Sequence, residues 1–548
     1  MAVAALVVSA VSIAPYFFSH YDEADGHKHY KLIKSHDIAN HYFAMEQFEK
    51  SLRSGTLYPR WYADANHGYG IATPNYYPPG FYYCAALVNA IFNNWHTTLL
   101  VIMVLAFAGS AAALYFLARA FFGRAPSAIA ALVYTLLPYH MLELYWRGAF
   151  PEIIGFIFLP LTLYFAYKAG AEGRWRDMAG LGFFYGLHLL THLPVGLMFT
   201  YALAFYALAW AAKESAPKIA LRIGAGMLLG LMVSAIYWLP AALESKYAFE
   251  NQTQIWPYHT AYISPLPTTD PFFSIIEKTW KLNALILLAA IAVLRAGKET
   301  RARRQVGLWL VMCGATLFMA TAFSYDISKL LPKIEITVPP FRWLAISSVF
   351  TALLVAACAD RLMKGEEFGR WRLWAYRGVA GAVIVLNIWF SARSVMSEAL
   401  ANPTFEPIQD YVEQGFTPNG STAPEKLPDT PLIIVEPQSS FSEVVRWEPQ
   451  SREVRVKADA PSKVRLKTYN FPGWTARVDG ERAAISSDKD GAQLIDVEPG
   501  LRTIEVDLES TPPRAVGAAL TTIGFLAVLA LGIADQLKRR RRPDEPQP

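Results

Sequence analysis

Long apolar stretches separated by short polar ones occupy most of the chain, and they predict a bundle of membrane-spanning helices. A helix needs about 20 apolar residues to cross a bilayer. The first run lacks a basic leading region and a small-x-small cleavage pattern, so we interpret it as a transmembrane helix and not as a signal peptide. Twelve crossings are expected, near residues 1–17, 97–121, 126–144, 152–169, 177–191, 194–212, 222–243, 282–296, 306–323, 344–362, 376–394 and 515–534.

Basic residues between the apolar runs predict the orientation. Six segments rich in Lys and Arg fall on one side of the membrane, namely ARAFFGRAP, KAGAEGRWRD, KESAPKIALR, RAGKETRARR, DRLMKGEEFGRWRLWAYR and KRRRRP. Cytoplasmic loops carry an excess of these residues, so both termini are predicted to be cytoplasmic and the protein integral to the plasma (inner) membrane. A crossing at 80–93 would invert every later loop, and we therefore expect that short run to form a helix on the outer surface.

The polar segment 395–512 has a different pattern. SKVRLKTYNF, TARVDG, QLIDVE and LRTIEVDLE alternate with period two and are bounded by Pro, Gly and Asp, which predicts strands of a small external β-sandwich, in the periplasm or outside the cell. The expected organisation is a transmembrane core at 1–394 with its first external loop at 18–96, a β-rich domain at 395–512, a final transmembrane helix at 513–534 and a basic cytoplasmic tail at 535–548.

Composition agrees with a membrane protein. Hydrophobic residues make up 53% of the chain and charged residues 17%, with a mean hydropathy of +0.23, whereas soluble domains carry roughly 25% charged residues. The net charge of +5 reflects the basic loops and does not indicate a nucleic-acid partner. Cys84, Cys313 and Cys358 form no CxxC pair and have no metal-ligand spacing, so we interpret them as small apolar residues.

Ionisable residues concentrate just after the first apolar run. Ile38, Tyr42 and Met45 recur at helical spacing, so 36–53 is predicted to be an amphipathic helix at the membrane interface. Asp37 and His41 share one face of it. A carboxylate beside the bilayer with His36 and His41 next to it is a candidate general base or metal ligand. The upstream segment YDEADGHKHY, which includes Asp25, has a plain alternative reading as a solvated polar loop.

The segment 57–83, LYPRWYADANHGYGIATPNYYPPGFYY, combines Pro, Gly and seven tyrosines. An aromatic belt at the membrane surface would explain the tyrosines but leaves Arg60 and the tight Gly-Tyr-Gly unexplained. Such a loop is also suited to forming a pocket, because Pro and Gly fix the backbone while tyrosines offer ring faces and hydroxyls. Arg60, Tyr69 and Tyr77 are therefore candidate substrate-binding residues.

Several helix ends bring polar groups to the same outer side. YWRGAFPE places Arg147 and Glu152 there, HLLTHLP places His192 and TVPPFRWL places Arg342. Ionisable residues at membrane depth are costly and are functional by default, so a shared cavity is expected. Arginine binds phosphate oxygens in a fork, a carboxylate takes a proton from a hydroxyl, and apolar walls hold a polyprenyl tail. A lipid-linked phosphate fits this combination.

These motifs, in this order, resemble the GT-C superfamily of membrane glycosyltransferases. The resemblance is closer to the bacterial and archaeal membrane proteins labelled "6-pyruvoyl-tetrahydropterin synthase-related". It spans about residues 1–395 and rests on the His-Asp pair at 36–37, GTLYPRW, GYG, YYPP, RGAFPE and PPFRWL. YNFPGWTARVDG is similar to the external β domains that follow such cores.

The resemblance implies a GT-C fold and an inverting sugar transfer from a polyprenyl-phosphate donor to a glycan, lipid or protein acceptor. In that family the essential acid lies in the first external loop, a role that falls on Asp37. Arg147, Arg342 and Arg60 would hold the leaving phosphate. Some members use a divalent cation (Mg, Mn or Zn), for which Asp25, Asp37 and His41 are the candidate ligands.

Two other classes of function fit parts of the pattern. A lipid flippase or transporter would need polar residues through the middle of several helices and repeated halves, whereas the middles of these runs are mostly apolar. A noncatalytic scaffold that binds glycan or lipid would keep the fold but direct Asp37 away from the arginines.

Overall fold

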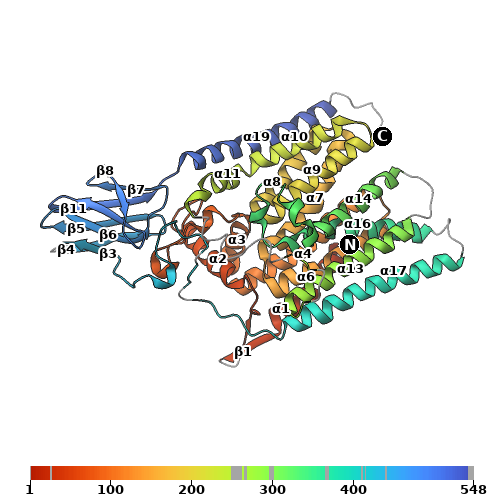
Figure 1. Cartoon of the computed structure of the whole chain (residues 1–548), viewed down its shortest axis with the longest axis horizontal. Coiled ribbons are helices and arrows are strands. Elements are labelled where there is room, and N and C mark those ends of the chain that lie inside the picture. The colour runs from red at the N-terminus through yellow and green to blue at the C-terminus, as the bar shows by residue number, and fades with distance from the viewer. Residues whose placement is uncertain are drawn as a thin grey trace.

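The protein has a helical body and a β domain at one end of it (Figure 1). The computed structural model describes residues 2–24, 27–248, 262–264, 268–294, 301–364, 370–408, 411–413, 415–437 and 441–540. Among these residues, a polytopic helical fold with a C-terminal β domain is confirmed.

Apolar runs account for most of the helices, and prolines, glycines and polar clusters end them. The α-helices are α1 (Ala2–Phe18), α2 (Ile38–Arg53), α3 (Gly80–Phe92), α4 (Trp95–Arg119), α5 (Arg124–Leu136), α6 (Pro138–Leu142), α7 (Phe150–Glu172), α8 (Trp175–Thr191), α9 (Leu193–Lys213), α10 (Pro217–Val233), α11 (Ala235–Glu244), α13 (Pro271–Leu294), α14 (Arg301–Met319), α15 (Tyr325–Ser328), α16 (Trp343–Lys364), α17 (Arg370–Phe390), α18 (Ser397–Ala399) and α19 (Pro512–Arg540). Short 3₁₀ or π turns are η1 (Asn66–Gly68), η2 (Thr73–Asn75), η3 (Glu143–Arg147), η4 (Ser245–Tyr247), η6 (Ala322–Ser324), η7 (Ile334–Thr337), η8 (Pro340–Arg342), η9 (Ser391–Met396) and η10 (Pro424–Lys426).

Seven helices in the described part of the chain are long and apolar enough to cross a membrane. An eighth span results if α10 and α11, which meet at an angle of 76°, are counted as one. Helices also form at the other predicted crossings, but α1, α8, α13 and α14 are shorter or more polar than this requirement. The figure of about twelve crossings stays a prediction.

Burial separates the centre of the helical body from its perimeter. Over the most apolar 18 residues of each helix, 89% of the residues are buried in α16, against 24% in α17 and 17% in α19. Helix α17 also exposes Trp371 and Trp374 near one end and Trp389 near the other, the placement that indole rings favour at the two faces of a bilayer. Helices α17 and α19 therefore have the apolar, exposed surfaces expected of lipid-facing helices.

The β domain consists of two antiparallel sheets whose inward-facing residues form one core. One sheet has the order β3-β6-β10-β9 and the other β4-β5-β11-β7-β8. Val454, Val464, Ile495 and Ile504 are fully buried, as the period-two alternation predicts. The strands are β3 (Ile433–Glu436), β4 (Phe441–Glu448), β5 (Ser451–Ala458), β6 (Ser462–Tyr469), β7 (Trp474–Val478), β8 (Glu481–Ala483), β9 (Ile485–Ser487), β10 (Ala492–Val497) and β11 (Gly500–Leu508), while β1 (His20–Ala24) and β2 (His27–Lys31) form a separate hairpin.

The segment 57–83 lies against the β domain. Trp61 and Trp474 meet edge to face with their ring centroids 5.6 Å apart. The backbone N–H of Tyr469 donates to the carbonyl of Tyr69 at 2.9 Å. Since rings from both sides interlock in this way, the β domain holds this segment in place.

Helix α2 forms as the apolar spacing predicts, but it is buried on more than the predicted face. Phe43, which is not part of that face, stacks on Tyr411 at 4.2 Å between ring centroids. His41 is only 3% exposed. The segment leading into the β domain covers α2 at Phe43, whereas His41 is covered by Tyr77, Tyr82 and Phe150. Local periodicity carries no information about either contact.

Candidate functional site

Asp37 is fixed by backbone pairing between two segments far apart in the sequence. Its N–H donates to the carbonyl of Arg147 at 2.7 Å, and the N–H of His36 donates to the carbonyl of Trp146 at 3.0 Å. Gly148, at φ +62°, permits the close approach, because a Cβ there would lie 2.2 Å from Ser35 Oγ. Asp37 is also the residue preceding α2, so its position follows from backbone geometry on both sides.

Arg147 is at the centre of the ionisable residues. Its Nη2 donates to Asp37 Oδ2 at 2.9 Å, and its Nη1 lies 3.0 Å from Glu143 Oε2 and 3.4 Å from Glu152 Oε2. The side chain of Arg147 is 6% exposed and that of Asp37 is 31% exposed. Arg147 is thus buried among carboxylates, and Asp37 is the member of the group that solvent reaches.

Glu152 connects Arg147 to two further predicted residues. Arg342 Nε donates to Glu152 Oε2 at 3.2 Å, and His192 Nε2 lies 3.6 Å from the same oxygen. The hydroxyl of Tyr139 donates to Glu152 Oε1 at 2.7 Å. Below, "the ion-pair cluster" means Asp37, Glu143, Arg147, Glu152 and Arg342.

Sequence reasoning missed Glu143 and Tyr139. Glu143 is fully buried and belongs to the π turn η3, a type of irregularity that is frequent at functional sites. The available signal was an acid inside an otherwise apolar run, four residues before an arginine. A pairing at this spacing is what a helical turn predicts.

Electrostatics keep Asp37 charged. Burial would raise the pKa of Asp37, but the positive charges of Arg147 and Arg342 outweigh that effect and lower it. Asp37 is therefore a carboxylate at neutral pH, ready to accept hydrogen bonds. Its Oδ2 binds Arg147, and Oδ1 accepts no hydrogen bond from the residues that the structure describes.

The two histidines beside Asp37 differ in environment. Burial lowers the pKa of His41 to about 4, so its ring is neutral at pH 7, and Nδ1 lies 3.1 Å from the hydroxyl of Tyr82. Tyr77 packs edge to face on the His41 ring at 5.7 Å. His36 is exposed, and its ring packs against that of Phe272 with the ring centroids 4.6 Å apart. His41 and Tyr77 thus form an aromatic wall next to Asp37.

Arg60 and Tyr69 lie elsewhere. The guanidinium of Arg60 sits 4.2 Å over the ring of Tyr58 and donates to the carbonyl of Ile236 at 3.4 Å. The hydroxyl of Tyr69 accepts a hydrogen bond from Arg465 of the β domain at 3.0 Å. The structure brings together Asp37, Arg147, Glu152, His192 and Arg342, with His41 and Tyr77 beside them, and it does not bring Arg60 or Tyr69 to this group.

The candidate metal ligands do not assemble into a site. Asp37 is paired with Arg147 and His41 with Tyr82, while Asp25 lies outside the described residues. No group of three His, Cys, Asp or Glu side chains within the described ranges is placed to hold a metal ion. A divalent cation stays a prediction, and no step below is assigned to one.

Several solved structures are similar to this chain at low sequence identity. They include an arabinofuranosyltransferase, AftD, from Mycobacteria (15% identity, TM-score 0.46, 72% of this chain and 26% of that chain). Another is the oligosaccharyltransferase of Archaeoglobus fulgidus (12% identity, TM-score 0.42, 72% of this chain and 56% of that chain). A third is ArnT from Cupriavidus metallidurans bound to undecaprenyl phosphate (14% identity, TM-score 0.40, 73% of this chain and 74% of that chain). At these values the likenesses carry no conclusion about chemistry.

Sequence comparison is more informative. No curated protein sequence matches the chain. The family model of the 6-pyruvoyl-tetrahydropterin synthase related domain, described as a membrane protein, matches residues 74–396, more than half of the chain. Arg147, Glu152, His192 and Arg342 fall inside the match, and Asp37 precedes it. The chain is a member of this 6-pyruvoyl-tetrahydropterin synthase-related family of membrane proteins.

Proposed function

We propose that the chain is an integral membrane glycosyltransferase that moves a sugar from a polyprenyl-phosphate donor to an acceptor hydroxyl at the outer face of the membrane. The observation that carries the proposal is the contact between Asp37 and Arg147 at 2.9 Å, with Arg342 linked to the same guanidinium through Glu152. A proton acceptor and two phosphate-binding groups thus come from three distant parts of the sequence.

The transfer would proceed by a single displacement. The acceptor hydroxyl oxygen forms a bond to the anomeric carbon, and the bond from that carbon to the phosphate oxygen breaks. Asp37 Oδ1 takes the acceptor proton, and the electron pair leaves with the polyprenyl phosphate. Because its pKa is lowered, Asp37 is a weak base that accepts the proton late, once the acceptor oxygen has gained positive charge.

Arg147 and Arg342 would stabilise the leaving phosphate. Guanidinium groups bind phosphate with parallel charge-assisted hydrogen bonds. Glu152 contacts both arginines, and Glu143 also contacts Arg147, which holds the guanidinium groups in place before the donor arrives. This preorganisation reduces the entropy that binding would otherwise cost. The neutral ring of His41 and the hydroxyl of Tyr77 would line the sugar side.

The alternatives make different demands on the same residues. A noncatalytic scaffold would direct Asp37 away from the arginines, whereas Asp37 contacts Arg147 directly. A flippase would need polar groups through the bundle, while α16, at the centre of the bundle, is apolar over most of its length. The glycosyltransferase reading uses every member of the ion-pair cluster, and neither alternative does.

The test is donor consumption by the purified full chain in lipid nanodiscs. Undecaprenyl phosphates carrying radiolabelled glucose, mannose, galactose or arabinose are supplied together with a cell-envelope extract as acceptor mixture. We expect one donor to yield free undecaprenyl phosphate and a labelled product, and Arg147→Ala to abolish both. Product formation that is equal in wild type and Arg147→Ala, or absent with every donor, would refute the proposal.

A further inference from the structure

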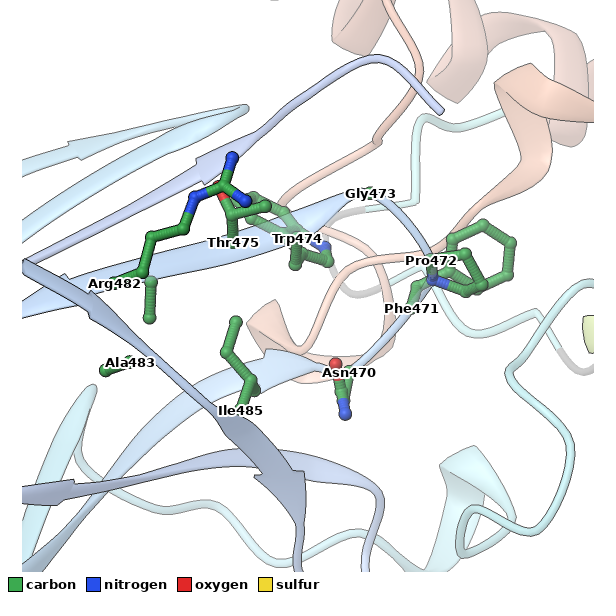
Figure 2. A pocket seen from close by; sticks show the side chains of 10 residues that line it. Asn470, Phe471, Pro472, Gly473, Trp474, Thr475, Arg482, Ala483 and Ile485 are labelled. Carbon is green, nitrogen blue, oxygen red and sulfur yellow. The ribbon is translucent and has the colours of Figure 1, made fainter. Parts of the chain in front are cut away.

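Two cavities outside the ion-pair cluster differ in their walls. A cleft of about 430 Å³ in the β domain lies between the segment 470–476 and Ala483 (Figure 2). The Asn470 amide at this cleft already donates to Ser487 Oγ at 3.1 Å, and the cleft indicates no particular ligand. The second cavity, of about 340 Å³, lies between α17 and the helices α5, α13 and α16. Most of its lining side chains are apolar, and it is called the α17 cavity below.

Small side chains on facing helices leave the α17 cavity open. Four alanines line it from three helices, namely Ala289 and Ala290 of α13, Ala359 of α16 and Ala380 of α17. Helix α17 runs along the edge of the helical body (Figure 1) and is tied to it on both sides of the gap. Arg377 Nε and Nη2 donate to the carbonyl of Leu362 at 3.1 and 2.8 Å, and the hydroxyl of Ser391 donates to the carbonyl of Leu136 at 2.9 Å. The space between these two attachments is not filled by the described residues.

The α17 cavity has the length of one lipid chain. Its lining residues on α17 run from Tyr376 to Asn387, a separation of 11 residues or about 16 Å along a helix. The hydrocarbon core of a bilayer is about 30 Å thick and contains two layers of chains, so each chain reaches about 15 Å. The lining residue of α16 closest in sequence to Arg342 is Val355, and this 13-residue separation places the cavity about 20 Å or more from the ion-pair cluster.

Arg377 supplies a positive charge at one end of the α17 cavity. It lines the cavity and is exposed, and its guanidinium lies 5.7 Å from the ring centroid of Trp374, one of the exposed indoles near the start of α17. Indole rings mark the level of the lipid headgroups. Among the described residues Arg377 contacts no carboxylate, and its hydrogen bonds go to a backbone carbonyl. A guanidinium at this level is suited to binding a lipid phosphate.

We propose that the α17 cavity binds one hydrocarbon chain of a phospholipid whose phosphate contacts Arg377. An apolar gap does not hold water, and its lining atoms lack dispersion partners on one side until an apolar molecule fills it. Lipid is the apolar molecule present along this edge, because only 24% of the residues in the most apolar part of α17 are buried. The donor would need its phosphate at the ion-pair cluster, about 20 Å away or more, so the occupant is a phospholipid. This inference does not depend on the transfer reaction.

The experiment titrates the detergent-purified full chain with dioleoyl phosphatidylglycerol and counts bound lipid by native mass spectrometry. We expect one lipid to bind to wild type ahead of all others, and Ala380→Phe to remove that binding by filling the cavity. Ala382→Phe adds the same bulk to an exposed alanine of the same helix and should bind like wild type. Arg377→Gln should weaken the first binding step roughly 10- to 150-fold by loss of a charge-assisted contact. Arg372→Gln, which changes another exposed arginine of α17, is its matched control and should not weaken it.

Three results would overturn the proposal. The first is the absence of a preferred phosphatidylglycerol on wild type, and the second is equal binding by wild type, Ala380→Phe and Arg377→Gln. The third is displacement of the bound lipid by equimolar undecaprenyl phosphate, because the cavity would then serve the donor. Arg377→Gln changes an exposed side chain and tests the site even if Ala380→Phe does not fold. Arg147→Ala should retain the lipid even if it abolishes transfer, so failure of this site and failure of the proposed reaction are distinguishable.

Discussion

Replacing Asp37 by Asn separates a role in chemistry from a role in folding. Asn keeps the shape of the side chain and its ability to accept a hydrogen bond from Arg147, but it does not take a proton. General-base catalysis contributes roughly 10²- to 10⁴-fold in rate, or about 2.7–5.5 kcal/mol of transition-state stabilisation. We therefore expect Asp37→Asn to lower turnover by that factor while donor binding is retained.

The structure sets the expected effect on stability. Two opposite charges about 4 Å apart interact by about 4 kcal/mol at an effective dielectric constant of 20, which is an upper bound here. Asp37 is 31% exposed, and Arg147 keeps Glu143 and Glu152 as partners when Asp37 is neutralised. The variant should consequently lose only about 1–2 kcal/mol of unfolding free energy.

The pH dependence of that loss has a definite sign. The pKa of Asp37 is lowered in the folded chain, so its stabilising charge is present above the unfolded value, about 4, and disappears as pH falls through the folded value. The stability gap between wild type and Asp37→Asn should be constant from about pH 5 to 8 and close in strong acid.

The assay compares turnover and thermal unfolding of wild type, Asp37→Asn and Asp64→Asn in the same detergent. Asp64, in the segment 57–83, is a matched control because its carboxylate forms a half-exposed ion pair with Lys50 of α2. Asp64→Asn should retain turnover. If Asp37→Asn turned over the donor at the wild-type rate, base catalysis by this residue would be refuted. If it failed to fold, the role would be structural.

Three further predictions follow from individual contacts. Arg342→Ala should weaken binding of undecaprenyl phosphate about 10- to 150-fold, by loss of one charge-assisted contact, whereas Arg174→Ala at a polar helix start should bind normally. Burial raises the pKa of Glu413 to about 7, so the folded chain favours the neutral carboxyl and loses unfolding free energy as pH rises through 7. Glu413→Gln stays neutral and should unfold at a higher temperature than wild type at pH 8. Gly148→Ala, whose Cβ would lie 2.2 Å from Ser35 Oγ at φ +62°, should lose more than about 1 kcal/mol of unfolding free energy.

Each of these has a result that contradicts it. Equal affinities of wild type and Arg342→Ala for undecaprenyl phosphate in equilibrium dialysis would remove this arginine from the phosphate site. A Glu413→Gln variant that unfolds at a lower temperature than wild type at pH 8 would contradict the predicted direction of the stability change. A Gly148→Ala variant with wild-type denaturant midpoint would show that residues 146–148 adjust without strain.

Apolar run length and local spacing predicted most of the elements. The runs at 97–121 and 344–362 became α4 and α16, and the period-two stretches became β6, β7, β10 and β11. These signals are local, because a helix or a strand repeats its own burial pattern every few residues. The burial of Phe43 on α2 depends instead on Tyr411, some 370 residues away, which no local pattern records.

The candidate site was partly predictable for a related reason. Arg147, Glu152, His192 and Arg342 could be assigned to one side because each lies at the end of an apolar run, and the cost of burying charge favours pairing among them. Arg60 was assigned instead from its place in the Pro-, Gly- and Tyr-rich segment 57–83, yet its position is decided by Ile236 and Tyr58. Glu143 could have been assigned too, because it is an acid four residues before Arg147 inside an apolar run, and the structure pairs the two side chains in the π turn η3.

The packing of the segment 57–83 against the β domain constrains the order in which the chain can be built. Tyr69 and its hydrogen-bond partner Arg465 are 396 residues apart. Trp61 likewise packs on Trp474, which is synthesised much later. During synthesis these aromatic side chains emerge early and lack their partners until most of the protein has been translated. Long-separated contacts of this kind form slowly, so until the β domain has been made the segment needs protection by a chaperone or by the membrane surface.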